Sequence, residues 1–463
     1  MRLALLTILL LALIAAPAGA SPRQVMSFEA PDELFDDSRR DATLDEIRAF
    51  GVTQIRQLVY WQTFAPGPKR KRKPRFDATD ASEYPAAPMG RLDRLMAAAR
   101  QRGIDVMLTP TGPVPRWATR KKKGNLNRPN PREFGRFVTA LARRYGDAVS
   151  MWSVWNEPNQ PQFLKPQYRK GRPYSPRLYR SLYRAAHRAI RSVPENRGDT
   201  ILIGETSPRG NENIVHPLAF LRGMACLNGK YRKSRKCARL PADGYAHHAY
   251  TTRIGPRFEP DDRDDVTIGV LDRLVDALNR AGRARGLPAR LKIYLTEFGI
   301  QSKPDRISGV SLARQPAYYS VAEHMAYVNP RVALFSQYLM RDDAPREEGY
   351  RFRGFESGLR RSNGSRKPAY RAFPNPLAVE RYGPTDVLWG LIRPQPGVTE
   401  VTVEARRSGS RRWRRLRRLR TTERGVYGLR AKHLKGQAYR VRWTSATGKR
   451  YVGPPIKAYK LGS

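Results

Sequence analysis

The sequence has 463 residues and a formal net charge of +46, from 87 Lys and Arg against 41 Asp and Glu. That length suits one large domain with a smaller one, and a hydrophobic content of 40% is too high for a disordered polybasic chain. Two cysteines exclude an iron–sulfur protein, a multi-cysteine zinc module and a disulfide-stapled miniprotein.

The chain begins with Arg2, an apolar run over 3–16, and small residues at Ala18 and Ala20. This pattern predicts a secretory signal peptide over residues 1–20. A membrane anchor is the alternative, but the run is shorter than the roughly 20 apolar residues that a span needs. We therefore expect an exported protein, secreted or associated with the cell wall, with no transmembrane segment after cleavage.

From residue 24 to about 376, strand-like runs alternate with amphipathic helical runs. The strand-like runs are Val25–Glu29, Gln54–Trp61, Asp105–Thr111, Ser150–Asn156, Thr200–Glu205, Gly244–Tyr250, Lys292–Glu297 and Arg331–Leu339. The helical runs are Leu44–Phe50, Arg91–Arg102, Pro131–Tyr145, Pro176–Val193, Glu212–Met224, Asp265–Arg285 and Pro316–Val328. Eight strands alternating with helices predict an α/β fold, a (β/α)₈ TIM barrel over 21–376. A doubly wound sheet is the alternative, but its usual glycine-rich turn after the first strand is absent from the sequence.

The pattern changes after Pro376. Thr399–Glu404 and Ala438–Trp443 alternate apolar and polar residues, which is typical of strands with one packed and one solvated face. We expect a small all-β, sandwich-like domain over 382–463. The stretch Trp413–Leu419 has a three-residue spacing that fits neither period, so its structure stays open.

Cys226 and Cys237 lie close in the sequence. In an exported protein they are expected to form a disulfide, with Cα atoms no more than about 7 Å apart. Two buried free thiols are the alternative.

In a TIM barrel the reacting groups lie at the C-terminal ends of the strands. The fourth run ends in Trp152-Ser-Val-Trp-Asn-Glu-Pro-Asn159, and the seventh ends in Ile293-Tyr-Leu-Thr-Glu-Phe-Gly299. Two carboxylates on opposite sides of one barrel mouth are what glycoside hydrolysis requires. Other polar residues at predicted strand ends are Glu29, Arg56, Glu205, His247, His248, Asp342 and Asp343.

The fragment Trp155-Asn-Glu-Pro-Asn159, followed by Thr296-Glu-Phe-Gly299, resembles the retaining glycoside hydrolases of clan A, most closely family 39 and family 5-like members from actinobacteria. The resemblance covers roughly residues 24–376, and such sequences often carry a trailing β domain. It implies a carbohydrate substrate, with Glu157 as the acid/base, Glu297 as the nucleophile and Asn156 holding the substrate 2-hydroxyl.

Physical chemistry supports these roles. Glu157 must be protonated to donate to the leaving oxygen, while Glu297 must be ionised to attack the anomeric carbon. Two carboxylates about 5–5.5 Å apart repel, so one pKa rises while the other stays low. Arg56 is placed to keep Glu297 ionised by charge pairing. The alternatives are a helix-capping role for Glu157 and a buried salt bridge for Glu297.

Other positions have weaker support. His248 and Tyr250 match the family's pattern of a His or Tyr near the nucleophile, with His247 or a structural histidine as alternatives. Glu205 is expected to bind sugar hydroxyls or to form a salt bridge. Trp117 is expected to stack on a sugar or to pack in a lid.

The eighth run departs from the family pattern. Members often have a Trp there that forms the floor of the sugar-binding site, whereas this chain has Phe335-Ser-Gln-Tyr-Leu339. Gln337 and Tyr338 are the nearest stand-ins. The sequence indicates no metal site, since most histidines are isolated, and no cofactor, since a phosphate-binding glycine loop is missing.

Basic runs at 69–75, 120–123 and 165–172 follow the second, third and fourth predicted strands, whose loops rise on the catalytic face. The run at 232–239 is expected on the opposite face, and residues 411–420 contain seven Arg. The rim of the mouth therefore suits an anionic polysaccharide, with solvated arginine-rich loops as the alternative. The sequence has no recognised nucleic-acid-binding motif.

The leading hypothesis is an exported glycosidase that cleaves O-glycosidic bonds by a two-carboxylate retaining mechanism, with an acidic polysaccharide as the substrate that its charge suggests. A catalytically inactive carbohydrate- or polyanion-binding barrel is the alternative, which the altered eighth strand keeps open.

Overall fold

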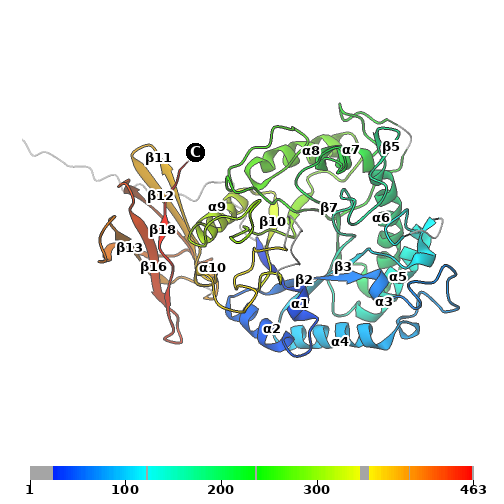
Figure 1. Cartoon of the computed structure of the whole chain (residues 1–463), viewed down its shortest axis with the longest axis horizontal. Coiled ribbons are helices and arrows are strands. Elements are labelled where there is room, and N and C mark those ends of the chain that lie inside the picture. Colours follow the sequence, from blue (N-terminus) through cyan, green and yellow to red (C-terminus); the bar gives the residue numbers. More distant parts are fainter. Residues whose placement is uncertain (1–23, 121–123, 235–236, 345–353, 396, 461–463) are drawn as a thin grey trace, which may run out of the picture.

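The computed structural model describes residues 24–120, 124–234, 237–344, 354–395 and 397–460. The expected signal peptide over 1–20, residues 121–123 of one basic run and residues 235–236 of another lie outside the described residues. Figure 1 shows a barrel domain, coloured blue to yellow, and a β domain, coloured orange to red, beside it.

Eight parallel strands close into a barrel in the order β1-β10-β9-β8-β7-β4-β3-β2. This confirms the TIM barrel and excludes a doubly wound sheet. In chain order the strands are β1 (Val25–Glu29), β2 (Gln54–Tyr60), β3 (Asp105–Thr111), β4 (Met151–Ser153), β7 (Thr200–Thr206), β8 (Gly244–His247), β9 (Lys292–Leu295) and β10 (Val332–Tyr338). The short strands β5 (Tyr168–Arg169) and β6 (Arg172–Pro173) form a hairpin in the loop after β4.

Helices surround the barrel (Figure 1). They are α1 (Pro31–Leu34), α2 (Arg40–Ala49), α3 (Trp61–Phe64), α4 (Ala86–Gln101), α5 (Pro131–Tyr145), α6 (Ser175–Arg191), α7 (Pro217–Met224), α8 (Leu271–Arg283), α9 (Arg314–Val328) and α10 (Pro368–Ala372). Helix α5 has the predicted bounds because the Asn130 side chain accepts hydrogen bonds from the first turn and Pro131 fixes the first helical residue.

Helix α7 begins later than the expected start at Glu212. The Asn211 side chain accepts from the backbone N–H groups of Asn213 and Ile214, which holds a turn in place of a first helical turn. The helix then starts at Pro217, where a missing N–H costs nothing.

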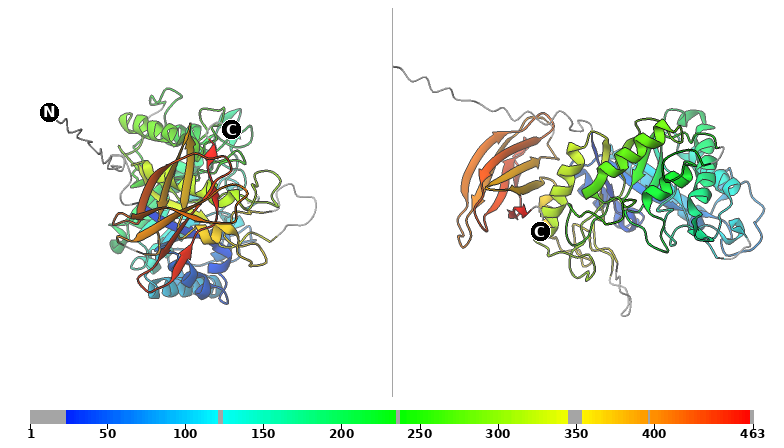
Figure 2. Two further views of the ribbon diagram at one scale, coloured as in Figure 1. Left: turned by 90° about the vertical axis from the view of Figure 1, so that its left-hand side faces the viewer. Right: turned by 90° about the horizontal axis from the view of Figure 1, so that it is seen from above.

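The C-terminal β domain is a sandwich of two sheets. One has the order β15-β12-β11-β19, and the other has β14-β13-β16-β17 with β18 beside β16. Their strands are β11 (Leu377–Tyr382), β12 (Thr385–Leu391), β15 (Val426–Lys432), β19 (Tyr459–Lys460), β13 (Glu400–Arg406), β14 (Arg414–Arg420), β16 (Ala438–Thr444), β17 (Arg450–Val452) and β18 (Ile456–Lys457). Residues from both sheets, among them Val379, Leu388, Val403 and Val441, form one apolar core. The sandwich packs on α9 (Figure 2). Val321 of that helix is buried against Ala378 and Trp389.

The stretch around Trp413, whose structure the sequence left open, forms strand β14. It pairs only with β13 among the described strands, and nearly all of its residues are exposed. An edge strand needs no buried face, which explains why its sequence shows no alternation.

The predicted disulfide is present: Cys226 and Cys237 are bonded, with Cα atoms 6.3 Å apart. It ties the chain just after α7 to the segment that leads into β8. None of the helices in the described part of the chain combines the length and hydrophobicity that a membrane span requires.

Candidate active site

Glu157 lies just beyond β4, in a loop with unusual backbone geometry. The strand ends at Ser153, three residues earlier than expected, and both Trp155 (φ 73°) and Glu157 (φ 37°) adopt left-handed conformations. The backbone N–H of Trp155 donates to Pro110, and its indole packs edge-on against Phe134. Non-glycine residues in this region cost free energy, so the packed indole holds the loop that presents Glu157.

Glu205 reaches the barrel interior through a bulge at the end of β7. Gly204 pairs with Ala246 and Thr206 with His247, so Glu205 is the extra residue. Gly204 has φ +118°, and a Cβ there would lie 2.5 Å from the carbonyl oxygen of Ala246. Only glycine fits this position, and the bulge turns the Glu205 side chain into the site.

Arg56 of β2 is the hub of the barrel mouth. Its side chain is fully buried, and its two terminal nitrogens donate to four side chains. One nitrogen donates to Glu29 at 2.6 Å and Glu297 at 3.1 Å, and the other to Asn156 at 2.7 Å and Glu205 at 2.9 Å. The expected pairing of Arg56 with Glu297 is therefore present, and the planar guanidinium also positions three further groups.

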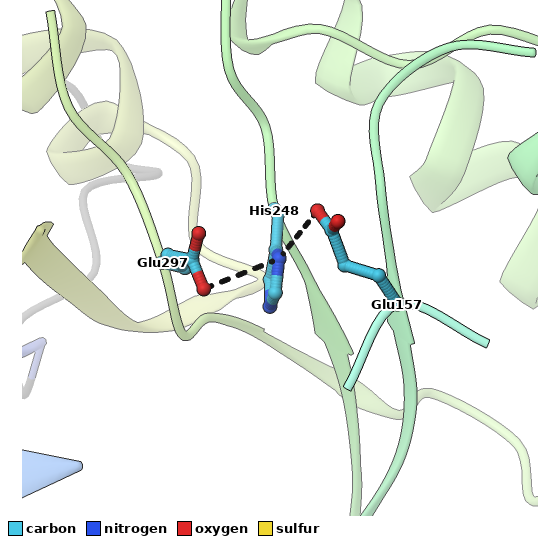
Figure 3. Close-up of side chains that lie close together, drawn as sticks. All are labelled: Glu157, His248 and Glu297. Atoms are coloured by element: carbon cyan, nitrogen blue, oxygen red, sulfur yellow. Dashed lines mark hydrogen bonds and ion pairs between the residues drawn. The ribbon is translucent and has the colours of Figure 1, made fainter. Parts of the chain in front are cut away.

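Glu157 and Glu297 face each other across the mouth, on either side of His248 (Figure 3). A carboxylate oxygen of Glu157 and one of Glu297 lie within 4.8 Å of each other. His248 Nδ1 lies 3.0 Å from Glu157 and 3.6 Å from Glu297, and its Nε2 lies 2.6 Å from Glu205. The side chain of Glu157 is 12% exposed and that of Glu297 8%, so both can reach a molecule bound in the mouth.

Of the two adjacent histidines, only His248 faces this cluster. His247 is buried with its ring nitrogens near the Val266 carbonyl and the Thr206 hydroxyl. Burial lowers the pKa of His247 to about 4, so it is a neutral structural residue.

The neighbours of each carboxyl set its protonation. Burial would raise the pKa of Glu205, but the Arg56 guanidinium and His248 lower it to about 2. Burial raises the pKa of Glu157 against the opposing effect of His248. Burial also raises the pKa of Glu29 to about 7, with Arg56 opposing it. Burial alone would lower the pKa of His248, but the carboxylates of Glu297, Glu157 and Glu205 raise it to about 10.

The two facing carboxyls have different neighbours. Arg56 and Tyr250 both donate to the Glu297 carboxylate. Glu157 accepts from Gln160 and lies beside His248, and burial raises its pKa. Two facing carboxyls in unlike surroundings are the arrangement that glycoside hydrolysis uses.

Several predicted residues join this site. The Tyr250 hydroxyl donates to Glu297 at 2.8 Å. Tyr338 lies edge-on to Tyr250 and to Phe355, with ring centroids 6.4 and 5.0 Å apart. The amide oxygen of Asn156 accepts from Arg56. Its Nδ2 has no protein acceptor among the described residues, so this nitrogen can donate to a ligand.

Two predicted residues do not face the site. Trp117 is buried, its indole N–H donates to Pro66 at 3.1 Å, and its ring packs edge-on against Trp61. Trp117 therefore has the packing role that was the alternative to stacking on a sugar. Gln337 is buried, and its amide nitrogen donates to the backbone carbonyls of Tyr338, Leu339 and Ser357. Of the two stand-ins on the eighth strand, only Tyr338 faces the mouth.

Sequence reasoning gave no role to Glu29, although it ends the first predicted strand. Its Oε2 accepts from Arg56, while its Oε1 is buried without a partner among the described residues. The position of Glu29 at a strand end could have marked it as a site residue. Its contact with Arg56 could not be foreseen from the sequence. Gln160, whose side chain donates to Glu157 at 2.8 Å, gave no signal at all.

Among the residues that the structure describes, two clusters have the composition of a metal site. Glu157, His248 and Glu297 form one, and His216, Asp262 and Asp265 form the other. The raised pKa of His248 keeps its ring protonated, which opposes metal ligation. In the second cluster His216 Nδ1 is hydrogen-bonded to Asp265 at 2.7 Å, and its Nε2 lies 3.6 Å from Asp262.

Comparison with known proteins agrees with this geometry. A family model described as Cellulase (glycosyl hydrolase family 5) matches residues 18–328. A family 39 glycoside hydrolase from Bacteroides cellulosilyticus WH2 shares the fold at 17% identity and a TM-score of 0.52, over 91% of this chain and 81% of that one. A monomeric beta-xylosidase from Caulobacter crescentus CB15 shares the fold at 17% identity and a TM-score of 0.51, over 94% of this chain and 97% of that one. The GH5_18 structure from Streptomyces cattleya, in complex with GlcNAc, shares it at 17% identity and a TM-score of 0.52, over 77% of this chain and 79% of that one. No curated protein matches the sequence.

Proposed function

Because the chain belongs to the cellulase family, glycosyl hydrolase family 5, we propose that it hydrolyses O-glycosidic bonds with retention of anomeric configuration. The observation that carries the proposal is the approach of Glu157 and Glu297 oxygens to within 4.8 Å. Retaining enzymes hold their two carboxyl groups about 5–5.5 Å apart, whereas inverting enzymes need about 6.5–9.5 Å to admit a water.

In the first step Glu297 attacks the anomeric carbon and Glu157 protonates the departing oxygen. The carbon–oxygen bond to the leaving group breaks as the ester to Glu297 forms. Arg56 and Tyr250 orient the Glu297 carboxylate for this attack. Asn156, fixed through its oxygen by Arg56, offers its NH₂ to a sugar hydroxyl.

In the second step Glu157 acts as a base, takes a proton from water, and the water oxygen replaces Glu297 at the anomeric carbon. The charge of the site stays constant throughout. When Glu297 is esterified it loses a negative charge, and Glu157, having given up its proton, gains one. His248, which lies between them, therefore balances one carboxylate in either state.

We propose an acidic polysaccharide as the substrate. The basic loops after β2, β3 and β4 pack on one another: the N–H of Arg116 donates to Pro68 at 2.7 Å, and that of Arg128 donates to Lys165 at 2.9 Å. Their charges therefore sum over one rim and raise the local concentration of a polyanion. Export, as the signal-like N-terminus predicts, would bring the protein to such polymers, and the disulfide suits an oxidising compartment.

Hydrolysis of a panel of aryl glycosides and acidic polysaccharides, with the first-formed anomer read by NMR, tests the reaction. We expect the product to keep the configuration of the substrate. Initial inversion contradicts the retaining mechanism, and binding without hydrolysis across the panel supports an inactive binding protein.

Salt dependence tests the substrate class. Attraction to the rim is screened over about 8 Å at physiological ionic strength. Turnover of an acidic polysaccharide should therefore fall steeply with salt through weaker binding, while a neutral aryl glycoside barely responds. Neutralising Lys69, Arg70 and Lys71 should weaken binding of the acidic substrate, whereas neutralising the exposed Arg100, Arg184 and Arg188 on α4 and α6 should not. The same flat salt response for both substrates contradicts the acidic-substrate proposal.

A further inference from the structure

The β-sandwich carries a groove of about 520 Å³ between its two sheets at their open edges. Strand β14 is the end strand of one sheet and β15 of the other, and residues from both line the groove. The groove therefore belongs to a different domain from the catalytic carboxyls. Its cationic lining residues, all exposed, are Arg407, Arg412, Arg414, Arg415, Arg417, Arg430 and Lys432.

The positive charge of this groove is uncompensated. No acidic residue is among its described lining residues, and none of its cations forms an ion pair with a residue that the structure describes. The acids nearby are engaged elsewhere, since Glu404 pairs with Arg440 and Arg442. A cleft lined by charge of one sign concentrates its field on the space inside, which attracts a polyanion.

The need to protect exposed sheet edges explains only part of the arginine and lysine content of the groove. Charged residues on an edge strand prevent pairing with another chain, and β14 alone would satisfy that need. Here the edges of both sheets place cations around one hollow. Two exposed apolar side chains, Leu416 and Leu434, also line it, with 40% and 36% of their surface exposed. Cations beside aliphatic surface match a ligand with anionic groups on a carbon–hydrogen face, as an acidic sugar ring has.

The groove is a poor match for single-stranded nucleic acid. Such sites stack bases on aromatic rings, and no aromatic side chain is among its described lining residues. The nearby Trp413 is covered, with the guanidinium groups of Arg406 and Arg440 lying 4.9 and 4.3 Å from its ring centroid.

We propose that this arginine groove is a second glycan-binding site, which holds a linear polysaccharide bearing carboxylate or sulfate groups. It anchors the protein to such a polymer independently of whether the barrel cleaves that same polymer.

Binding by the full chain tests the proposal. A Glu297→Gln background prevents turnover, and the probes are polygalacturonate for carboxylates, heparin for sulfates and xylan as the neutral control. Substituting Arg415, Arg417 and Arg430 with Gln should weaken binding of at least one acidic probe by about tenfold or more, and that binding should be lost at high salt. These side chains are exposed, so the melting temperature should not change.

The matched control carries Gln at the exposed Arg100, Arg184 and Arg188, which removes the same net charge from the barrel. It should bind within about threefold of the parent. Equal losses in both triple variants would mean that only net charge matters, and no loss in the groove variant would remove the site; either result overturns the proposal. If a DNA duplex binds more tightly than both acidic glycans and depends on the groove, the occupant is a nucleic acid and the proposal is wrong. Because hydrolysis is measured separately, this outcome is independent of the catalytic assignment.

Discussion

The barrel mouth and the groove of the sandwich use arginine in opposite ways. Arg56 is fully buried and donates to three carboxylates and an amide of its own chain. The groove arginines are exposed and have no acidic partner among the described residues. A buried cation whose partners are all internal fixes geometry, whereas an exposed unpaired cation can act only on a molecule from outside. We propose that the same residue type positions the reacting carboxyls in one domain and binds an external polyanion in the other.

The largest difference should appear when one arginine from each region is replaced by methionine. Arg56→Met leaves the buried carboxylates without their cation, and the free energy of unfolding should fall by about 3–5 kcal/mol. Arg415→Met should change it by about 0.5 kcal/mol or less, because the side chain is exposed. Urea unfolding measures both. Similar small losses would mean that Arg56 is not the hub of the mouth.

Arg56→Lys sharpens this comparison. Lysine keeps the charge but lacks the planar fork that reaches all four partners. We expect partial recovery of stability with kcat/KM still well below the parent value. Full recovery of activity would show that charge alone, and not the fork, organises the site.

Glu157→Ala should affect substrates according to their leaving groups. A poor leaving group needs protonation, so its kcat/KM should fall by about 10²–10⁴. An activated aryl leaving group departs without a proton and should lose far less. The kcat/KM values for a series of aryl glycosides measure this difference. Equal losses of kcat/KM across the series would contradict the assignment of Glu157 as the acid/base.

Glu29→Gln should alter how stability depends on pH. In the folded chain the pKa of Glu29 is about 7, against an ordinary value of 4.5, so the folded state holds this proton more tightly than the unfolded state. Its contribution to stability is therefore full below about pH 4.5 and is lost as the pH rises toward about 7, by an amount of up to about 3 kcal/mol. Glutamine does not titrate, so the variant should lose less stability over this range.

Urea unfolding at several pH values checks this expectation, with the exposed Glu83→Gln as the control. The difference between Glu29→Gln and the parent should grow in favour of the variant up to about pH 7 and then level off. A constant difference over the whole range would mean that the pKa of Glu29 is the same in the folded and unfolded states, which contradicts the expectation.

The facing positions of Glu157 and Glu297 were predictable because chain order alone brings the ends of parallel barrel strands to one mouth. The motif around Glu157 and the Glu ending the seventh run were therefore enough to place both carboxylates. The fold followed in the same way from eight alternating strands and helices. The predicted elements differed at their ends, as at α7, where a side-chain turn at Asn211 replaced the first helical turn. The short helices α1, α3 and α10 and the hairpin of β5 and β6 were not predicted.

What the sequence could not provide is the direction of individual side chains. Glu205 enters the site because a bulge at Gly204 turns it inward, and no periodicity records such a bulge. Trp117 looked available for sugar stacking until its packing against Trp61 placed it in the core. The arginines around Trp413 read as a basic run, and only the arrangement of β14 and β15 shows that they surround one groove.

The central claim is that Glu297 forms a covalent bond to the sugar. An activated 2-deoxy-2-fluoro glycoside tests it, since the fluorine slows both steps while a good leaving group keeps the first one fast enough for the ester to accumulate. Mass spectrometry of the protein and its peptides should show one added fluoro-sugar on the peptide that contains Glu297, and none in Glu297→Gln. Labelling of another residue, or no labelling by a glycoside whose natural analogue is hydrolysed, would contradict the account.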